Sequence, residues 1–269
     1  MENELKESRT LGGSLLGEQE LNDGDPNTDE QRRIDEEQTK KQIKPPDAAI
    51  NQQHALQYWQ SVDATTDSML GGISSLSGFS HISKVDLQGS RSFLAKLGIG
   101  TKNGRRSVAN ILEGGAGYDE SLQEQITVGR VTEGLLLHVG TAIDIIEPVQ
   151  KFTAQLEGKK GIRTIFNVGL EDWEPVQGVQ YDLVWTQWCA GHLTNEQFVR
   201  YLKQCKAALN KEDGLIIIKE NTSTSGTDVF DPVDSSVTRE DRRFRELFKA
   251  AGLRIIKSET QKGASSKAT

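Results

Sequence analysis

Three side chains able to take part in binding or catalysis lie within six positions of one another: Gln187, Trp188 and His192. They follow the apolar run at 183–185, which is typical of a parallel strand buried on both faces. Ligands of open α/β sheets bind just beyond the carboxyl ends of the strands. An amide, an indole and an imidazole at such an end predict a binding site. The alternative is a core strand followed by a packed tryptophan and a capped histidine.

A glycine-rich turn gives a second candidate site. Glu113 is followed by Gly-Gly-Ala-Gly at 114–117, and glycine after a strand lets the backbone approach a ligand closely. Glu147 ends a second apolar run, IDIIEP, where a carboxylate can accept hydrogen bonds from ribose hydroxyls. A tight turn alone would also explain the glycines. Together with Glu147, they predict a cofactor that contains a nucleoside.

The spacing between the glycine turn and this acidic residue is unusual. Gly115 and Glu147 are 32 positions apart, whereas such folds place them about 20 apart. The polar segment 118–128 accounts for the excess.

Strands and helices that alternate from residue 107 onward would bring these groups together. Alternation of this kind predicts an α/β fold, in which helices cover both faces of a parallel sheet. Strands are predicted at 107–113, 142–147, 163–168, 181–187, 214–219 and 253–258. Helices are predicted around 93–97, after the Gly-Ser pair at 89–90, and at 130–138, 149–156, 198–209 and 244–251, where Gly252 is a natural stop.

The first fifty residues differ in composition from the rest of the chain. They contain no aromatic residue, and their 13 acidic and 7 basic side chains give a net charge of −6, against −7 for all 269 residues. Such a segment cannot bury enough apolar surface to offset the entropy of ordering. We therefore expect a disordered acidic tail at 1–53, a folded domain at 54–261 and a short tail at 262–269. The domain divides into an N-terminal helical lid at 54–100 and an α/β core at 107–261.

Composition also excludes several classes of protein. No basic block suits nucleic acid, no apolar run is long enough to cross a bilayer, and the N-terminus lacks the apolar core of a signal peptide. Cys189 and Cys205 lie in apolar segments, which indicates a reducing compartment and no disulfide framework. We expect a soluble monomer of the cytoplasm and also the nucleus, with neither nucleic-acid nor membrane partners and no metal.

Six short motifs carry a resemblance to a known family. They are YW at 58–59, DSMLGG at 67–72, SR at 90–91, WTQWCAGHLT at 185–194, KEN at 219–221 and DPVDSSVTR at 231–239. With these motifs the chain resembles the protein N-terminal methyltransferases, which methylate the α-amine of proteins that begin Xaa-Pro-Lys. They are class I S-adenosylmethionine-dependent methyltransferases with a Rossmann-like sheet. The resemblance covers residues 58–261.

The resemblance implies S-adenosylmethionine as the cofactor. The family's glycine loop reads GAG, one apolar residue and then GR, which residues 115–117 and 129–130 match on either side of the 118–128 segment. Gly115 and Arg130 would contact the methionine end of the cofactor, the arginine pairing with its carboxylate. The implied cofactor-binding residues are Gly115, Gly117 and Arg130, Glu147 at the ribose, Leu170 and Glu171 at the adenine, and Gln187 near the sulfonium.

The resemblance also implies how the substrate amine is treated. The nucleophile must be the neutral amine, and an α-amine has a pKa of about 7.7–8.0. Asp234 and His192 match the family's general-base pair, and a carboxylate with an imidazole suits that task. Asn221 matches the residue that holds the substrate N-terminus.

Four further residues are implied to bind the peptide. Trp188 would pack on the proline ring, and Trp59 would close over the peptide. Asp231 and Ser236 would receive the lysine. Without the resemblance, Trp59 would be read as a clamp that holds an extra helix, and the residues at 231–236 as a polar loop before a helix.

Two departures from the family leave three functions open. The segment 118–128 interrupts the glycine loop, and we expect it to weaken cofactor binding unless it bulges outward as a separate loop. The chain ends in KGASSKAT, without the family's final β-hairpin. The chain is then an active α-N-methyltransferase, an impaired relative that binds such N-termini, or a small-molecule methyltransferase of the same fold. Paired tryptophans and aspartates around a peptide-sized site argue against the last.

Overall fold

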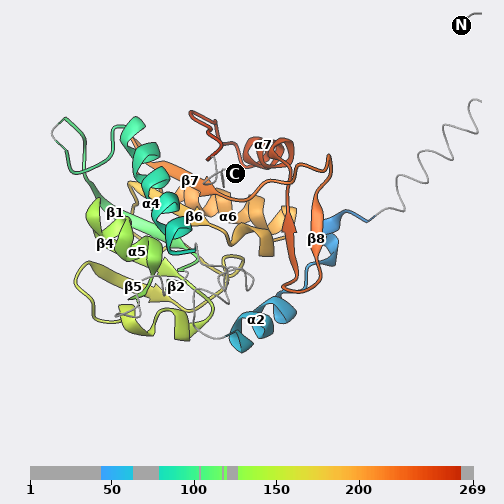
Figure 1. Cartoon of the computed structure of the whole chain (residues 1–269). Helices are drawn as coiled ribbons and strands as arrows, with labels where there is room; N and C mark the ends of the chain where they lie inside the picture. Colours follow the sequence, from blue (N-terminus) through green and yellow to red (C-terminus); the bar gives the residue numbers. More distant parts are fainter. Residues whose placement is uncertain (1–43, 63–78, 103, 117, 120–126, 262–269) are drawn as a thin grey trace, which may run out of the picture. The chain divides into compact units, whose positions relative to one another are not determined.

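A five-stranded parallel sheet forms the centre of the fold (Figure 1). The computed structural model describes residues 44–62, 79–102, 104–116, 118–119 and 127–261. The strand order is β5-β4-β1-β6-β7, so the order reverses between β1 and β6, where a doubly wound sheet opens its ligand crevice. The strands are β1 (Val108–Gly114), β4 (Gly140–Ile146), β5 (Ile162–Phe166), β6 (Leu183–Gln187) and β7 (Leu215–Lys219).

Successive residues of the strands face two separate cores. On β6, the side chains of Leu183 and Trp185 pack into one core, and that of Val184 packs into the other. Helices cover both faces, as predicted for the α/β fold. The first face carries α4 (Phe79–Lys96) and α5 (Arg130–Gly134), and the second carries α6 (Asn195–Ala207) and α7 (Asp241–Ala250).

Two predicted helices are broken. The helix predicted at 130–138 is α5 followed by η3 (Leu136–His138). The break lies at Gly134, which α4 approaches so closely that a Cβ there would lie 2.7 Å from a Leu87 methyl carbon. The helix predicted at 149–156 is two turns, η4 (Gln150–Phe152) and η5 (Ala154–Leu156). Thr153 separates them, and its hydroxyl donates to the Gln150 carbonyl at 3.1 Å, which competes with helix formation.

The short helix predicted around 93–97 is part of the much longer α4. Gly89 and Ser90 lie inside α4 and do not precede it. A Cβ at Gly89 would lie 2.6 Å from the end of the flexible Gln261 side chain, which would have to move to accommodate it.

The sixth strand predicted at 253–258 is wrong. Residues 253–261 form no ladder with β7 or with any other described segment, and Ile256 is 56% exposed. Side chains attach this segment to α4 instead. Lys96 pairs with Glu259 at 2.7 Å, and Gln261 donates to the Val85 carbonyl at 3.1 Å. The segment is therefore held by side-chain contacts with α4, and it does not pair with the free edge of β7, the last strand of the sheet.

The folded part begins earlier than the predicted boundary at residue 54. The compact unit starts at Pro45, and η1 (Pro46–Ala49) and the first two residues of α2 (Gln52–Ser61) fall inside the predicted tail. Asp47 is buried, and its carboxylate accepts hydrogen bonds of 2.8 Å from the backbone N and the Nδ2 of Asn195 at the start of α6. The prediction missed this part because it used the average composition of the first fifty residues, which hides the short apolar stretch at the end of that segment. Residues 1–43 and 262–269 lie outside the described residues.

Two short antiparallel pairs lie beside the main sheet. Strands β2 (Tyr118–Asp119) and β3 (Thr127–Val128) pair at the base of the inserted segment. Strands β8 (Val229–Asp231) and β9 (Ser236–Thr238) form the second pair. Helix α2 lies at the foot of this second pair (Figure 1), where the Asn51 backbone N–H donates to Ser235 Oγ at 2.8 Å.

Candidate active site

A cavity of about 550 Å³ opens at the carboxyl ends of the central strands. It lies at the point where the strand order reverses, and α2 contributes part of its wall. Most of the predicted cofactor and substrate residues line this one cavity. They are Trp59, Gly115, Arg130, Glu147, Leu170, Glu171, Gln187, Trp188 and His192.

The glycine turn after β1 closes tightly against the next loop. Gly115 has φ +78°, and a Cβ at this position would lie 2.6 Å from Cys189 Sγ. Only glycine combines this backbone conformation with this close approach. The Gly115 backbone N–H donates to the Ile146 carbonyl at 2.9 Å, which fixes the turn beside the end of β4.

The inserted segment leaves the glycine loop and re-enters it at one place. Tyr118 pairs with Val128 across β2 and β3, so the two ends of the segment lie side by side. Gly129, at φ +79°, then caps α5, and Arg130 reaches the cavity. The two ends of the segment are therefore closed against each other, and residues 120–126 lie outside the described residues. Gly117 lies outside the described residues.

Two buried glutamates stand at the ends of β1 and β4. Burial raises the pKa of Glu113 to about 7 and the pKa of Glu147 to about 8, with the charge of Glu113 adding to the second shift. Glu147 lines the cavity, and its Oε1 accepts from the Val149 backbone N–H at 2.9 Å. Thr132 Oγ1 donates to Glu113 Oε2 at 2.5 Å, and Glu113 Oε1 has no hydrogen-bond partner among the described residues.

Arg130 and Gln187 share a partner that sequence reasoning missed. Asp86 on α4 accepts from Arg130 Nη1 at 2.5 Å and from Gln187 Nε2 at 2.9 Å. Lys219 at the end of β7 also pairs with this carboxylate. No local signal in the sequence marks Asp86, because its partners lie 44 to 133 positions away.

Trp188 occupies a strained backbone position. Its φ is +55°, in the left-handed region that a bulky residue enters at a cost of about 1–3 kcal/mol. Its backbone N–H donates to the Lys219 carbonyl at 3.1 Å, which holds the turn after β6. The Arg130 guanidinium carbon lies 4.9 Å from the centre of the Trp188 ring. The turn therefore places the Trp188 ring against the Arg130 guanidinium in the lining of the cavity.

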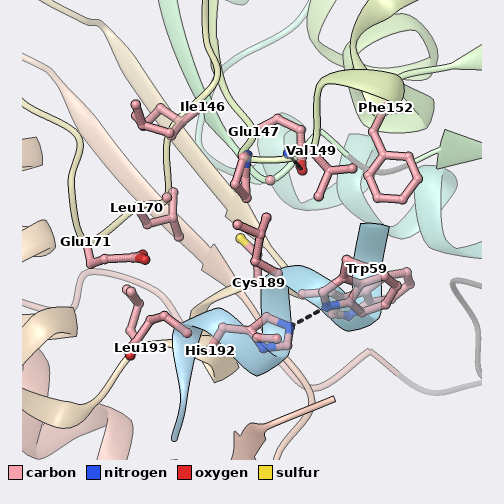
Figure 2. A pocket seen from close by; sticks show the side chains of 18 of the residues that line it. Trp59, Ile146, Glu147, Val149, Phe152, Leu170, Glu171, Cys189, His192 and Leu193 are labelled. Carbon is pink, nitrogen blue, oxygen red and sulfur yellow. Dashed lines mark hydrogen bonds between the residues drawn. The ribbon is translucent and has the colours of Figure 1, made fainter. Parts of the chain in front are cut away.

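Trp59 and His192 lie side by side in the wall of the cavity (Figure 2). The Trp59 Nε1–H donates to His192 Nε2 at 3.0 Å, so the proton of the neutral imidazole lies on Nδ1. That Nδ1 is buried, and the Ser235 backbone acts on the ring in the same direction as the charge of Asp234, towards a higher pKa. Burial lowers the pKa of His192, and this effect outweighs the opposing charge of Asp234. The imidazole is therefore held neutral.

The remaining predicted substrate residues lie beside the cavity and do not line it. Asp234 acts electrostatically on His192, which places the predicted base pair together. Ser236 Oγ and its backbone N–H donate to Asp234 Oδ1 at 2.7 and 3.1 Å. Asp231 and Asn221 are exposed, so they are accessible to a peptide that approaches from outside.

Tyr58 is a second residue that sequence reasoning left without a role. Burial raises the pKa of its hydroxyl, and the charges of Asp234 and Asp231 raise it further. Its ring packs edge-on against Trp59, with the two ring centres 5.1 Å apart. The YW motif thus brings Trp59 to the cavity and Tyr58 towards the acidic residues Asp231 and Asp234.

A buried arginine holds the loop that carries His192. Arg239 is 0% exposed; its Nη1 donates to the Ala190 carbonyl at 3.0 Å and its Nε to Asn195 Oδ1 at 2.9 Å. Arg239 directly follows β9, whereas His192 ends η6 (Ala190–His192). The guanidinium therefore joins the loop of the imidazole to the hairpin of Asp234.

Comparison with known proteins decides the family. The model of the AdoMet-dependent proline di-methyltransferase family matches residues 47–268. The chain belongs to this family. The match begins at Asp47, which agrees with the early start of the folded part.

Individual relatives agree with the family match. The chain is 39% identical over 213 residues to alpha N-terminal protein methyltransferase 1 of Schizosaccharomyces pombe, which covers 78% of this chain and 88% of the relative. It is 36% identical over 209 residues to N-terminal Xaa-Pro-Lys N-methyltransferase 1 of Danio rerio, covering 76% and 85%. A solved SAM-dependent methyltransferase from Leishmania major is 31% identical with a TM-score of 0.63, covering 79% of this chain and 77% of that structure.

Membership confirms the predicted family resemblance, the class I methyltransferase fold and the cofactor, S-adenosylmethionine. The cavity fits this cofactor on its own features, since the Gly115 cradle leaves no space for a side chain and Glu147 presents a carboxyl group at the end of β4. Among the described residues, no three His, Cys, Asp or Glu side chains are arranged to hold a metal ion. None of the described helices has the length and apolar character needed to cross a membrane.

Proposed function

We propose that this chain transfers a methyl group from S-adenosylmethionine to the α-amino group of proteins whose N-terminus reads Xaa-Pro-Lys. The observation that carries the proposal is the neutral His192 imidazole in the wall of the cavity, on which Asp234 acts from the hairpin that also carries the exposed Asp231. Relatives that cover three quarters of the chain are named for this reaction.

Two groups would hold the ends of the cofactor. Arg130, which lines the cavity, would pair with the carboxylate of the methionine end. Glu147 would accept hydrogen bonds from the ribose hydroxyls. Leu170 and Glu171 would line the adenine, and Gln187 would lie near the reacting sulfur. When bound, the cofactor supplies a methyl group on a positively charged sulfur.

The residues of the chain prepare the amine. An α-amine with a pKa of about 7.7–8.0 must lose one proton before it has a lone pair to offer. The neutral His192 has a single lone pair, on Nε2, and the Trp59 indole already donates to it. A peptide must therefore displace this indole before His192 accepts a proton. Asp234 lies near enough to stabilise the resulting imidazolium.

The residues around the site explain the choice of substrate. Proline in the second position presents a ring to the Trp188 indole, which lines the cavity. Lysine in the third position would meet Asp231, and Ser236 is fixed beside it through Asp234. Asn221, which follows β7, would hold the substrate backbone near its N-terminus.

The test uses three peptides that differ only near the N-terminus. The first begins Xaa-Pro-Lys, the second has glutamate in the third position, and the third has an acetylated α-amine. We expect methylation, measured as added mass, of the first peptide alone, because glutamate meets Asp231 with like charge and an acetylated amine has no nucleophile. Equal rates on the lysine and glutamate peptides would exclude the assignment of Asp231. Binding of the first peptide without methylation would indicate an impaired relative, and methylation of small amines alone would indicate a small-molecule enzyme.

The proposal extends to the state and location of the protein. We propose a monomer, which acts on protein N-termini in the cytoplasm and the nucleus. Sedimentation of the purified chain and imaging of the tagged protein test these two points.

A further inference from the structure

One carboxylate collects hydrogen bonds from three elements at the cofactor end of the cavity. Asp86 is 4% exposed on α4. Its Oδ2 accepts from Arg130 Nη1 at 2.5 Å and from Gln187 Nε2 at 2.9 Å, and its Oδ1 pairs with Lys219. Arg130 begins α5, Gln187 ends β6 and Lys219 ends β7. Helix α4 thus makes contact with each of these elements through a single side chain.

In this cluster of described residues, two cationic side chains share one carboxylate. Arg130 and Lys219 carry one charge each, and their side chains are only 10% and 19% exposed. Asp86 balances one of the two. Burial opposes ionisation of Asp86, but Arg130 and Lys219 hold its pKa below the ordinary value. A cluster with one net positive charge is matched to a ligand with one carboxylate.

Asp86 itself does not line the cavity, whereas Arg130 and Gln187 do. Its effect on a ligand therefore acts through these two side chains. The Gln187 amide is held at both ends, because Trp185 Nε1 donates to its Oε1 at 3.1 Å. Ser90, one turn further along α4, completes the support and accepts from Lys219 Nζ at 2.8 Å.

We propose that Asp86 is a positioning residue that fixes the Arg130 guanidinium and the Gln187 amide for the amino-acid end of S-adenosylmethionine. The inference rests on the proposed function, because it takes Arg130 as the partner of the cofactor carboxylate. It also gives the SR motif of α4 and the lysine of the KEN motif a shared role.

Orientation and charge make opposite predictions for Asp86→Asn. If Asp86 acted only as a counter-charge, its removal would leave two positive charges and tighten the binding of a carboxylate. If it orients Arg130, the freed guanidinium would lose its fixed direction and binding would weaken. The sign of the change in affinity therefore separates the two roles.

The experiment compares two ligands by isothermal titration of the full chain. S-adenosylhomocysteine has the amino-acid end, whereas 5′-methylthioadenosine has the same adenosine and sulfur without it. We expect Asp86→Asn to weaken S-adenosylhomocysteine binding by about tenfold or more, equivalent to about 1.4 kcal/mol. The affinity for 5′-methylthioadenosine should stay within about twofold of the parent.

Two further variants separate positioning from a loss of fold. Asp182→Asn removes a carboxylate that accepts from the Ala109 and Asn110 backbone at the opposite ends of the strands, and we expect it to leave the ratio of the two affinities unchanged. Asp86→Glu keeps the charge and should restore part of the affinity for S-adenosylhomocysteine.

Each result decides the role of Asp86. Unchanged or tighter binding of S-adenosylhomocysteine to Asp86→Asn would overturn the inference, as would an equal loss of affinity for both ligands. If Asp86→Asn does not fold, Asp86→Glu provides the same comparison of the two ligands. A parent chain that binds 5′-methylthioadenosine but not S-adenosylhomocysteine would instead overturn the proposed role of Arg130.

Discussion

The Nε1 of Trp59 lies 3.0 Å from the Nε2 of His192, so one hydrogen bond joins α2 to the proposed general base. The two residues are 133 positions apart in the sequence. The bond occupies the only lone pair of the neutral imidazole. His192 is thus held in one tautomer, but it is also prevented from accepting a proton until Trp59 moves. Helix α2 therefore links the arrival of a substrate to the availability of the base.

Trp59→Phe should raise the pKa of His192. The indole donates to the neutral imidazole and stabilises that form, so removal of the donor favours the protonated form. A hydrogen bond of about 1 kcal/mol corresponds to a rise of about 0.7 pKa units. NMR titration of the histidine ring measures the shift, with His192→Gln to assign the signal among the four histidines.

Trp173→Phe is the matched control for this change. Trp173 is a second tryptophan, but it is fully buried, its Nε1 has no hydrogen-bond partner among the described residues, and it does not line the cavity. This variant should leave the pKa of His192 in place. A His192 titration that is identical in the parent and in Trp59→Phe would contradict the proposed effect of the bond.

Asp234→Asn should lose turnover without losing the fold. The carboxylate accepts from Ser236 and acts on His192, and an amide can keep the first contact but not the charge. We expect kcat to fall by about 100-fold or more, the range of general-base contributions, while the melting temperature changes by less than about 2 °C. Asp241→Asn, in an exposed ion pair with Arg245, is the control. Turnover within about twofold of the parent would remove Asp234 from the mechanism.

Glu147→Gln should stabilise the protein at high pH more than at low pH. The folded-state pKa of Glu147 is about 8, against an ordinary value of 4.5, so the folded chain holds a proton that the unfolded chain releases between these values. The parent therefore loses stability as the pH rises through this range. Glutamine is neutral throughout and has no such loss.

The size of this effect is measured by urea unfolding at pH 5 and pH 8. The stability of Glu147→Gln relative to the parent should rise by about 1 kcal/mol or more between the two, since one pKa unit corresponds to 1.36 kcal/mol. Above the pKa of about 8, where Glu147 of the parent is ionised, the same variant should bind S-adenosylhomocysteine more weakly, because a neutral amide accepts ribose hydroxyls less strongly than a carboxylate. A stability difference that is independent of pH would mean that Glu147 ionises normally in the folded chain.

Two truncations should have different effects on stability. Removal of residues 1–43 leaves the compact unit that starts at Pro45, and we expect a change in melting temperature of less than about 2 °C. Removal of 1–53 also deletes the Asp47 contacts with Asn195 and the Asn51 cap of α2. It should lower the melting temperature by several degrees, because an N-cap alone contributes about 1 kcal/mol. Asp47→Asn in the full chain should reproduce part of the loss, and equal melting temperatures for the two truncations would show that residues 45–53 do not stabilise the fold.

The position of Gly115, Glu147 and Gln187 in one cavity could be predicted because these residues follow strand ends. Gly115, Glu147 and Gln187 each come directly after or at the end of an apolar run, and a parallel sheet brings such ends together. The prediction needed only local patterns and one rule of topology. The same reasoning failed at 253–258, where the apolar pattern was present but no edge was paired with it.

The groups that orient this site could not be found in the same way. Asp86 lies on a helix whose extent was hidden by the Gly89-Ser90 pair, and it meets Gln187 and Lys219 only after the fold has formed. Arg239 was noted within a motif, but its hydrogen bonds to Ala190 and Leu193 are not implied by any spacing. Such contacts depend on how elements pack, and the sequence of each element alone does not specify them.

The inserted segment provides the last prediction. The sequence alone predicted weaker cofactor binding, because eleven residues separate the two halves of the glycine loop. In the structure, Tyr118 and Val128 are paired, so the segment is closed at its base, and Arg130 reaches the cavity and is held there by Asp86. Replacement of 118–128 by one isoleucine should therefore leave the affinity for S-adenosylhomocysteine within about threefold, or about 0.7 kcal/mol, of the parent. Titration of both forms measures this, and Arg130→Met in each form checks that the arginine contributes equally. Binding that tightens by about tenfold in the shortened chain would show that the insertion does disturb the loop.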